Sequence, residues 1–416
     1  MNANAPHSKP ACDPRLWPLD LQVTFLNHGS FGSCPRAVLE FQRELQDRLE
    51  QQPVQFFVRD LEGLLDQARH ALAGFVGAAA EDLVFVPNAT SGVNTVLRSL
   101  RFQSGDELLV ANHEYNACRN AVNFVAGQCG ARVVEAKVPF PLKSAEPIME
   151  AVLRRVTSRT RLALLDHITS QTGLVFPIER LVRELNRRGI DALVDGAHAP
   201  GMVPLSLQEL GAAYYTGNCH KWLCAPKGAA FLFVRRDRQK LIRPLVISHG
   251  ANSPRTDRSR FLIEFGWTGT NDPSAWLSVP KSIEFMRSLL PGGWPEIMRR
   301  NRELALAARR IVCRALKMPP PCPDELIGSL AAFPLPDSVE KNPPQSPLYL
   351  DPLQDKFLHE YGLEVPIIPW PAPPKRLLRI SAQLYNSLPQ YERLARALAE
   401  TFPSLPAKCT TRRRRA

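Results

Sequence analysis

The sequence predicts an α/β protein with one large, mostly parallel sheet domain followed by a smaller α+β domain. Strand-like and helix-like segments alternate over about 150 residues, the pattern of a parallel sheet covered by helices. Polar clusters follow several predicted strands, at the carboxyl ends where such sheets bind ligands. After Val234 the alternation weakens, and a proline-rich break at 319–323 precedes the last elements. These features favour a second domain there.

Composition places the chain among soluble globular proteins. Its 416 residues are 44% hydrophobic and 22% charged, and no apolar run approaches the roughly 20 residues that span a membrane. The first 18 residues lack the apolar core of a signal peptide, so we expect a loose polar arm. The nine cysteines are scattered without CxxC pairs, which predicts no metal site and a reduced, cytoplasmic setting.

The formal net charge is +12, and residues 412–415 are four consecutive arginines. A basic surface can bind nucleic acid, but no nucleic-acid motif accompanies this charge, so we expect neither a nucleic-acid nor a membrane partner. We divide the chain into an N-terminal arm (1–25), a large domain (26–290), a small domain (291–405) and a disordered basic tail (406–416).

The first elements surround a glycine-punctuated loop at 26–33, which either lines a site or only connects two elements. Helical spacing of apolar residues predicts a helix from about Pro35 through Leu45 and another over 61–76. A strand at 83–86 leads to Thr90 and Ser91 at the start of a helix. These hydroxyl residues are either simple N-caps or, with the free amides of the helix N-terminus, a phosphate cradle.

The central region alternates regularly. We expect strands at 107–111, 131–138, 161–167, 192–194, around 214 and at 229–234, and helices at 118–126, 147–156 and 178–188. The polar residues at the predicted strand ends include Thr90, Ser91, Tyr115, Ser170, Gln171, Asp195, His198, His220 and Lys221. Because the carboxyl ends of parallel strands meet at one edge of a sheet, we expect these side chains to lie together.

The C-terminal part reads as a separate set of elements without internal repeats. We expect a glycine-rich turn at 265–272, helices at 276–289, 295–316, 353–361 and 391–400, a loop at 343–347 and a strand at 377–381.

Asp195 and Lys221 indicate the chemistry. Asp195 ends a buried strand, and Lys221 lies in a polar turn after the next one, between His220 and Trp222. Pyridoxal phosphate needs such a pair, because a carboxylate keeps its pyridine nitrogen protonated and a lysine carries its aldehyde as a Schiff base. A lone turn lysine is more often a solvated surface residue, and Asp195 could be only a helix cap. Their occurrence together favours the cofactor.

Taken together, these stretches resemble the class V aminotransferase-fold enzymes that use pyridoxal phosphate, and among them the isopenicillin N epimerase-like family. The resemblance covers roughly residues 20–402. Its matching stretches are 26–32, 88–94, 113–115, 170–173, 194–198, 220–222, 266–270 and 379–386. It implies fold type I of the pyridoxal phosphate enzymes, pyridoxal 5'-phosphate as the cofactor, and a homodimer.

The resemblance also implies a role for each matched residue. Lys221 would hold the cofactor and move protons at the substrate Cα, Asp195 would pair with the pyridine nitrogen, and Tyr115 would stack on the ring. His198 would contact the ring hydroxyl, with Gln171 nearby. The residues that would hold the phosphate are Thr90, Ser91, Asn218, His220 and, from the second subunit, Thr270. Arg379 would bind the substrate α-carboxylate, because a guanidinium contacts two oxygens at once.

The reaction implied by the resemblance takes place at the Cα of an amino acid, through an external aldimine, and the leading hypothesis is an amino-acid epimerase. Epimerisation needs reprotonation from the second face, for which Tyr115 and His28 are candidates, unless Lys221 serves both faces. His28 is also a candidate for contacting the substrate.

Three alternatives remain. A carbon–sulfur lyase acting on a cysteine conjugate or sulfoxide needs only the proton shuttle, and an aminotransferase is also possible chemically. A desulfurase is not expected, because residues 365–374, where that group carries its nucleophilic cysteine, contain none. A non-catalytic regulator or basic binding protein is disfavoured by the intact Lys221 and Asp195.

Overall fold

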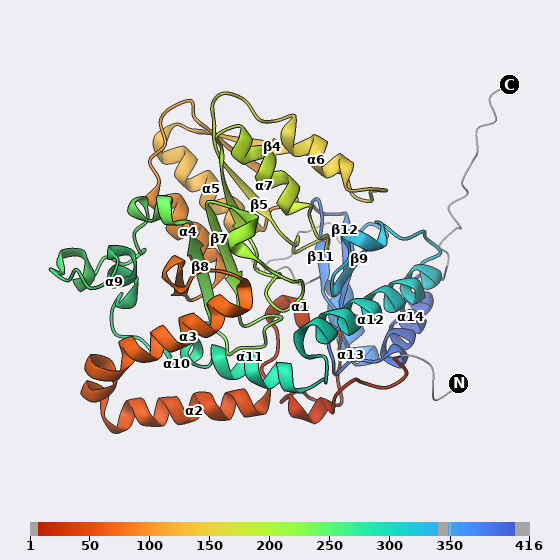
Figure 1. Ribbon diagram of the computed structural model, residues 1–416. Coiled ribbons are helices and arrows are strands. Elements are labelled where there is room, and N and C mark those ends of the chain that lie inside the picture. Colours follow the sequence, from red (N-terminus) through yellow and green to blue (C-terminus); the bar gives the residue numbers. More distant parts are fainter. Residues whose placement is uncertain (1–6, 340–347, 349–350, 404–416) are drawn as a thin grey trace.

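The computed structural model describes residues 7–339, 348 and 351–403, and it confirms the predicted α/β class (Figure 1). The predicted loop at 343–347 and the basic tail lie outside these residues. The main sheet has the order β2-β8-β7-β6-β5-β3-β4. Its strands are β2 (Leu83–Val86), β3 (Glu107–Ala111), β4 (Arg132–Ala136), β5 (Thr160–Asp166), β6 (Asp191–Asp195), β7 (Tyr214–Asn218) and β8 (Ala230–Val234). β8 pairs antiparallel with β2 and β7, and the remaining neighbours pair parallel.

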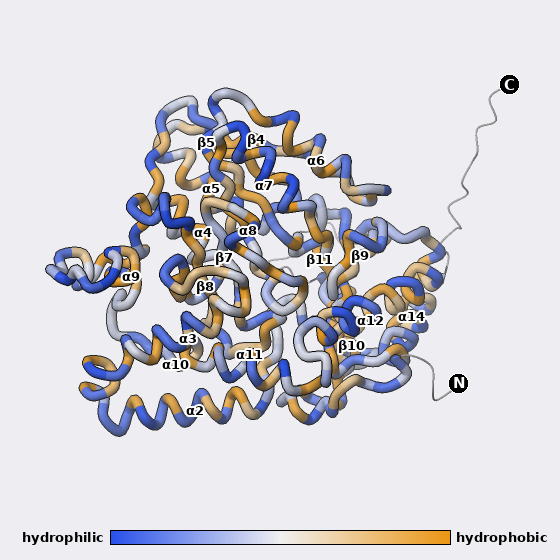
Figure 2. The backbone as a smooth tube through the Cα atoms, viewed as in Figure 1, coloured by the Kyte–Doolittle hydropathy of each residue, from blue (hydrophilic) through white to orange (hydrophobic). Residues whose placement is uncertain are grey.

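Alternate side chains of the main sheet enter two different cores. On β3, Leu108 and Val110 belong to one buried cluster, and Leu109 and Ala111 belong to the other. Helices cover both faces, so the central strands are buried along most of their length, and Figure 2 shows many hydrophobic residues in this part of the chain. The helices near the sheet are α3 (Leu61–Val76), α4 (Ala89–Ser99), α5 (Asn116–Cys129), α6 (Glu146–Leu153), α7 (Ile178–Arg187) and α8 (Leu207–Leu210). A π-helical turn, η2 (Gln55–Asp60), joins α3 to the preceding α2 (Arg36–Gln51).

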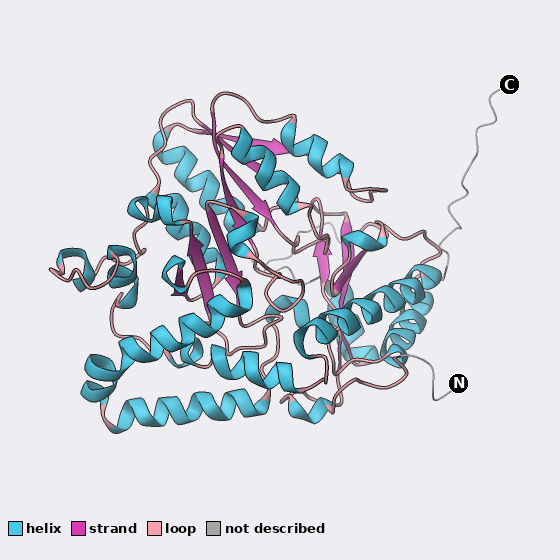
Figure 3. Ribbon diagram, viewed as in Figure 1, coloured by secondary structure: helices cyan, strands magenta, loops and turns pink. Residues whose placement is uncertain are grey.

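The C-terminal part forms a smaller three-stranded antiparallel sheet with its own helices, seen beside the main sheet in Figure 3. Its strands, in the order β11-β12-β9, are β9 (Leu330–Pro334), β11 (Ile367–Pro369) and β12 (Arg376–Ser381). The helices here are α12 (Gly293–Ala315), α13 (Pro352–Tyr361) and α14 (Leu388–Thr401), of which α12 and α14 pack against each other. β12 is the strand that carries Arg379.

The N-terminal arm is packed over its described residues, which corrects the expected loose arm. Trp17 is completely buried, and the backbone N–H of Ala11 donates to the Leu384 carbonyl at 2.8 Å. The short strand β1 (Thr24–Phe25) pairs in parallel with β10 (Leu363–Glu364). A buried tryptophan and a strand pairing anchor a segment that composition alone presents as polar.

Three further differences have local causes. The glycine-punctuated loop contains a short helix, α1 (His28–Phe31). Residues expected as a glycine-rich turn begin inside α9 (Arg260–Gly266), which Ser259 caps by accepting from the Leu262 N–H at 3.2 Å. The helix expected at 276–289 is divided into α10 (Ser274–Leu277) and α11 (Val279–Ser288). Proline lies in the first turn of α11, where its missing N–H is tolerated. Among the described residues, every helix is too short or too polar to cross a membrane.

Candidate active site

A cavity of about 510 Å³ lies where β5, β6 and β7 end, and the last residue of each strand lines it. The lining residues are Ser30, Phe31, Asn88, Ala89, Thr90, Ser91, Tyr115, Asp166, Ser170, Asp195, Ala197, His198, Asn218, His220 and Lys221. The structure therefore brings together most of the residues that the sequence predicts for the cofactor. Their convergence follows from the parallel sheet, which puts strand ends from separate parts of the chain at one edge.

Lys221 and His198 form the centre of this cavity. The Lys221 amine lies 3.2 Å from Nε2 of His198, and the Trp222 indole N–H donates to Nδ1 of His198 at 3.4 Å. Because an indole can only donate, Nδ1 is the acceptor and the neutral ring carries its proton on Nε2. That proton points at the Lys221 nitrogen, which accepts it when the amine is neutral.

Burial favours the neutral forms of both groups. Burial and the charge of Lys221 hold the pKa of His198 well below its usual range. Burial, followed by the charge of Arg379, lowers the pKa of Lys221 to about 8, while the Asp195 carboxylate acts in the opposite direction. About one tenth of Lys221 is therefore a free amine at pH 7, far more than for an ordinary lysine, and a nucleophilic lysine requires this form.

Asp195 is 2% exposed and is held by two donors. One carboxylate oxygen accepts from the Ala197 N–H at 2.9 Å, and the other accepts from the Cys118 thiol at 3.2 Å. Burial raises the pKa of Asp195, and these two hydrogen bonds and the charge of Lys221 oppose that rise. The donors fix the orientation of the carboxylate at the end of β6.

The N-terminus of α4 forms another wall of the cavity. The Asn88 side chain caps the helix by accepting from the Ser91 N–H at 2.8 Å, and the Asn218 side chain accepts from the Ala89 N–H at 2.8 Å. A Cβ at Gly92 would lie 2.1 Å from Oγ1 of Thr216, so only glycine lets the helix approach β7 this closely. Helix N-termini favour anions, so the phosphate cradle stays a prediction for this wall, where the Ala89 and Ser91 N–H groups donate to side chains.

Arg379 reaches the cavity wall from β12 of the small domain. It is 2% exposed, donates to the Ser30 hydroxyl at 2.8 Å, and donates to the Ser170 carbonyl. Burial lowers the pKa of Arg379 to about 10, which leaves the guanidinium charged at neutral pH. Ser30 and Ser170 line the cavity, so the arginine lies directly behind its surface.

His28 does not line the cavity. Its Nδ1 lies 2.8 Å from the Tyr385 hydroxyl and its Nε2 lies 3.0 Å from the Lys221 carbonyl oxygen. The ring is completely buried against Trp222, and burial lowers its pKa to about 3. Both nitrogens are engaged, so this arrangement places His28 behind Lys221 in place of the substrate contact or acid role that the sequence predicts.

Gln171 and Thr270 also lie outside the cavity lining. The Gln171 amide is 3.5 Å from the Glu114 carbonyl oxygen. Thr270 is exposed and lines a separate hollow of about 390 Å³ that it shares with Gln46 and Phe57. Within one chain, Thr270 is therefore not part of the site.

Sequence reasoning missed Asp166, Glu114, Cys118 and Ser30. Asp166 is the register partner of Asp195 on the neighbouring parallel strand, so the strand-end rule could have found it. The predicted strand was extended one residue past it, to His167. Glu114 precedes α5 and Cys118 lies in its first turn, and only the fold brings their side chains within 4.8 Å of Asp195, so spacing in the sequence did not indicate them.

These residues fit pyridoxal phosphate. The cavity offers a buried amine with a lowered pKa, a buried carboxylate fixed by two donors, and a helix N-terminus suited to a phosphate. The fold and the site together define a pyridoxal phosphate-dependent enzyme.

Comparison with known proteins refines this class, because the family model described as aminotransferase class-V matches residues 35–311. The chain belongs to this family, whose cofactor is pyridoxal phosphate. It is 37% identical over 396 residues to an isopenicillin N epimerase from Amycolatopsis lactamdurans, covering 92% of this chain and 96% of that protein.

Two other similarities complete the comparison. A probable chloroplastic L-cysteine desulfhydrase from Arabidopsis thaliana is 32% identical, covering 90% of this chain and 82% of that protein. The solved structure of a C-DES mutant with glycine covalently linked to its PLP cofactor has a TM-score of 0.76 at 22% identity. That match covers 93% of this chain and 99% of the other, and it shows a shared fold.

Proposed function

We propose that the protein is an amino-acid epimerase that removes and returns the proton at the substrate Cα. The observation that carries this proposal is the presence of two proton-transfer groups, Lys221 and Tyr115, in the lining of one cavity. The isopenicillin N epimerase from Amycolatopsis lactamdurans, similar over almost the whole chain, supports it. When bound, pyridoxal phosphate withdraws electrons from the Cα and so weakens its C–H bond.

Lys221 is the base for one face in this proposal. With a pKa of about 8 it can both release and accept a proton near neutral pH, which is the condition for efficient general acid–base catalysis. Arg379, behind Ser30 and Ser170, would draw the substrate carboxylate toward the small domain. The Cα would thereby be held between the two domains.

Tyr115 is the proposed acid for the second face. It lines the cavity, and 39% of the residue is exposed, which leaves Tyr115 accessible to a molecule bound there. His28 no longer competes for this role, because both of its nitrogens are engaged behind Lys221.

A carbon–sulfur lyase is the second candidate function. The desulfhydrase relative from Arabidopsis thaliana supports it, and β-elimination needs one base to remove the Cα proton and no acid on the opposite face. A persulfide-forming desulfurase is disfavoured, because none of the eight described cysteines lines the cavity.

We also propose that two copies of the chain assemble, with Thr270 of each copy completing the phosphate site of the other. Thr270 is exposed and is absent from the cavity of its own chain, which is the position such a contribution requires. Sedimentation of the purified protein would test the assembly, and a monomer that retains full cofactor affinity would exclude it.

The deciding experiment is incubation of the cofactor-loaded protein in heavy water with L-amino acids and cysteine conjugates. The epimerase predicts deuterium at Cα with inversion and without keto acid. The lyase predicts pyruvate, ammonia and a released thiol or sulfenate. Tyr115→Phe sharpens the test, because it should suppress inversion by about 10²–10⁴-fold and leave β-elimination nearly unchanged. Keto acid with retained sulfur would instead indicate transamination.

A further inference from the structure

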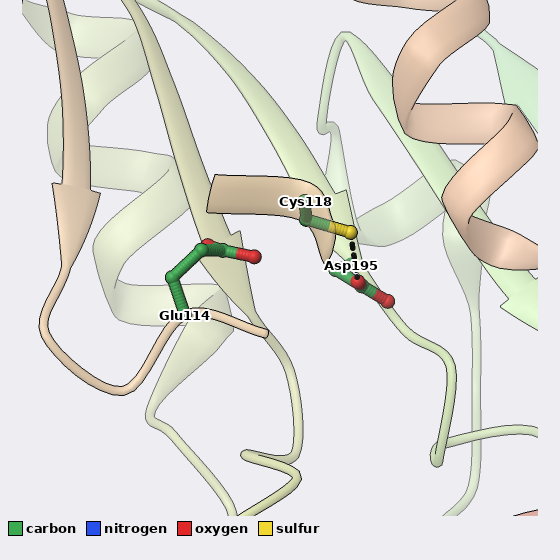
Figure 4. A group of neighbouring side chains, drawn as sticks. All are labelled: Glu114, Cys118 and Asp195. Carbon is green, nitrogen blue, oxygen red and sulfur yellow. Dashed lines mark hydrogen bonds between the residues drawn. The ribbon is translucent and has the colours of Figure 1, made fainter. Parts of the chain in front are cut away.

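Three acidic side chains meet around the base of the cavity. Glu114 follows β3, Asp166 ends β5 and Asp195 ends β6, and all three are at least 95% buried. Cys118, on the first turn of α5, lies between Glu114 and Asp195 in Figure 4. The sulfur and one oxygen from each of Glu114 and Asp195 lie within 4.8 Å of one another. Ionising all three carboxyl groups in one buried cluster would cost a large free energy, because the charges repel one another and lose their hydration.

The hydrogen bonds are distributed unequally among these acidic side chains. Asp195 accepts from the Ala197 N–H and from the Cys118 thiol. Neither carboxyl oxygen of Glu114 accepts a hydrogen bond of good geometry from the described residues, and the backbone N–H of the adjacent Tyr115 acts on the carboxyl group only as a minor influence. Arg119, the nearest arginine to act on Glu114, is paired with Glu135 at 2.7 Å. An ionised carboxylate without donors is the costliest form in such a place, so Glu114 is the member that favours its neutral form.

We propose that Glu114 is a buried neutral carboxylic acid, which leaves the negative charge of the cluster on Asp195. The thiol of Cys118, between the two, donates to Asp195 and completes the arrangement. The inference rests on the proposed function in one respect, namely that Asp195 is the carboxylate facing the pyridine nitrogen. If Glu114 is neutral, Asp195 carries the negative charge next to the pyridine nitrogen. An ionised Glu114 would add a second negative charge and would compete with Asp195 for the protonated nitrogen.

The electrostatics of the surrounding elements agree with this assignment. Burial, and then the carboxylates of Asp166 and Asp195, raise the pKa of Glu114 well above its usual range. The Tyr115 backbone N–H and Arg119 act weakly in the opposite direction. Burial raises the pKa of Cys118 as well, so its sulfur keeps the proton that it donates.

Asp166 and Asp195 differ from Glu114 because Lys221 faces them. Its positive charge lowers the pKa of both aspartates, against the rise that burial causes. Lys221 is not among the groups that act on Glu114. Burial and the Asp195 carboxylate nevertheless raise the pKa of Asp166 well above its usual range, whereas Asp195 also accepts two hydrogen bonds. The negative charge of the cluster therefore resides on Asp195, beside the lysine, and Glu114 keeps its proton.

Glu114→Gln tests the proposal, because glutamine matches a neutral carboxylic acid in size and charge. We would record the infrared spectrum of the full-length, cofactor-loaded protein in heavy water near pH 7. The carbonyl stretch of a protonated carboxyl group should be present in the wild type and reduced in Glu114→Gln. Glu264→Gln is the matched control, because Glu264 is equally buried but paired with Arg260 and Arg243. This control should leave the protonated-carboxyl band unchanged.

The proposal also predicts effects on the bound cofactor that a merely structural role of Glu114 would not produce. Glu114→Gln should keep kcat/KM within about tenfold of the wild type and keep the pH dependence of the bound cofactor's absorbance. Glu114→Ala, which removes the neutral carboxyl group from the cluster, should shift that pH dependence. Cys118→Ser should shift that pH dependence less than Glu114→Ala does, because its hydroxyl can still donate to Asp195.

Four outcomes overturn the proposal. These are an unchanged band in Glu114→Gln, a Glu114→Gln protein that fails to fold, and a cofactor spectrum that Glu114→Ala leaves unaffected at every pH. The fourth is a stoichiometric divalent cation that a chelator removes with loss of stability, since the same donor atoms would then hold a metal. The proposed function can fail separately. If Glu114→Gln reduces the band but the wild type exchanges no Cα proton, the neutral Glu114 is supported and the epimerase is excluded.

Discussion

The amine of Lys221 lies 3.2 Å from Nε2 of His198, on a ring whose other nitrogen accepts from the Trp222 indole. This chain of contacts directs a proton toward the lysine nitrogen and favours its neutral form. Together with burial, it makes Lys221 ready to capture an aldehyde without a separate base.

The first prediction concerns the pH at which Lys221 becomes reactive. With a pKa of about 8, the neutral amine increases about tenfold per pH unit below pH 8 and levels off above it. We expect the rate of cofactor uptake by cofactor-free protein, followed by absorbance, to show this profile. Lys221→Ala should bind no cofactor covalently. A midpoint near the ordinary lysine value of 10.5 would contradict the buried environment described here.

His28 provides the second prediction, which separates a supporting role from substrate binding. Its Nε2 meets the Lys221 carbonyl oxygen at 3.0 Å, so His28→Gln should lower the free energy of unfolding by about 1–3 kcal/mol. Urea titration measures this change. If His28 contacted the substrate, KM would rise while the unfolding free energy stayed nearly constant.

The same residue sets an acid limit on stability. The pKa of His28 is about 3 in the folded protein and near 6.5 when unfolded, so the unfolded chain binds the additional proton between these values. Stability from this group is therefore present above pH 6.5 and is lost as the pH falls toward 3. The unfolding free energy of His28→Gln should accordingly decline less steeply over that window than that of the wild type.

Gly92 carries the third prediction. A Cβ there would lie 2.1 Å from Oγ1 and 2.7 Å from Cβ of Thr216, so Gly92→Ala must displace α4 from β7. We expect a loss of about 1–3 kcal/mol in unfolding free energy and weaker cofactor binding, because the displaced helix N-terminus lines the cavity. Gly74→Ala in α3 is the control: no atom lies within 4 Å of its Cβ, and helix propensity predicts a gain of up to about 1 kcal/mol. Equal effects of the two substitutions would refute the steric explanation.

Much of the architecture could be predicted because the strands obey a simple rule. Strands β2 and β3 have the bounds that apolar runs between turn residues indicate, and the parallel alternation then places Asp195, His198 and Lys221 at one edge. The strands of the small domain were harder to predict from the sequence. β9 pairs with β12, which is distant in sequence, and β11 has only three residues, so no local period marks either strand.

The candidate site was predictable only where chemistry and position coincide. Lys221 and Asp195 could be expected at one edge of the sheet because each reactive group occurs at or just after a strand end, and both line the cavity; their roles stay predictions. His28 was misplaced because its glycine-punctuated loop predicts accessibility, whereas Tyr385 and Trp222, distant in sequence, enclose its ring. Burial of that kind depends on tertiary packing, which residue spacing does not encode.

Cysteine chemistry gives the fourth prediction. Of the eight described cysteines, none lines the cavity, and burial raises the pKa of the Cys34 thiol to about 12. Iodoacetamide applied to the native protein should therefore leave activity nearly unchanged, and mass spectrometry should locate any label outside the cavity. Treatment in denaturant is the control, because it exposes every thiol. Rapid inactivation with one label on a cysteine that is buried in the native protein would support the desulfurase hypothesis instead.

The last prediction concerns Arg379 and the substrate carboxylate. Arg379 donates to the Ser30 hydroxyl at 2.8 Å, and that hydroxyl lies 2.6 Å from the Asn27 side chain, to which it donates. This relay fixes the plane of the guanidinium, which a lysine cannot reproduce even though it keeps the charge. We expect Arg379→Lys to lower kcat/KM for an amino acid by about 10–100-fold, the loss of one charge-assisted hydrogen bond. The corresponding amine, which lacks the carboxylate, serves as the internal comparison.

Only the ratio of kcat/KM for the amino acid to kcat/KM for the amine identifies the role of Arg379. If the arginine binds the carboxylate, the amine reacts equally poorly with the wild type and with Arg379→Lys. If Arg379 instead only supports the fold through Ser30 and Ser170, both substrates decline together and the unfolding free energy declines with them. Ser30→Ala should give a smaller loss in the same direction, because it removes one partner of the guanidinium and leaves its charge in place.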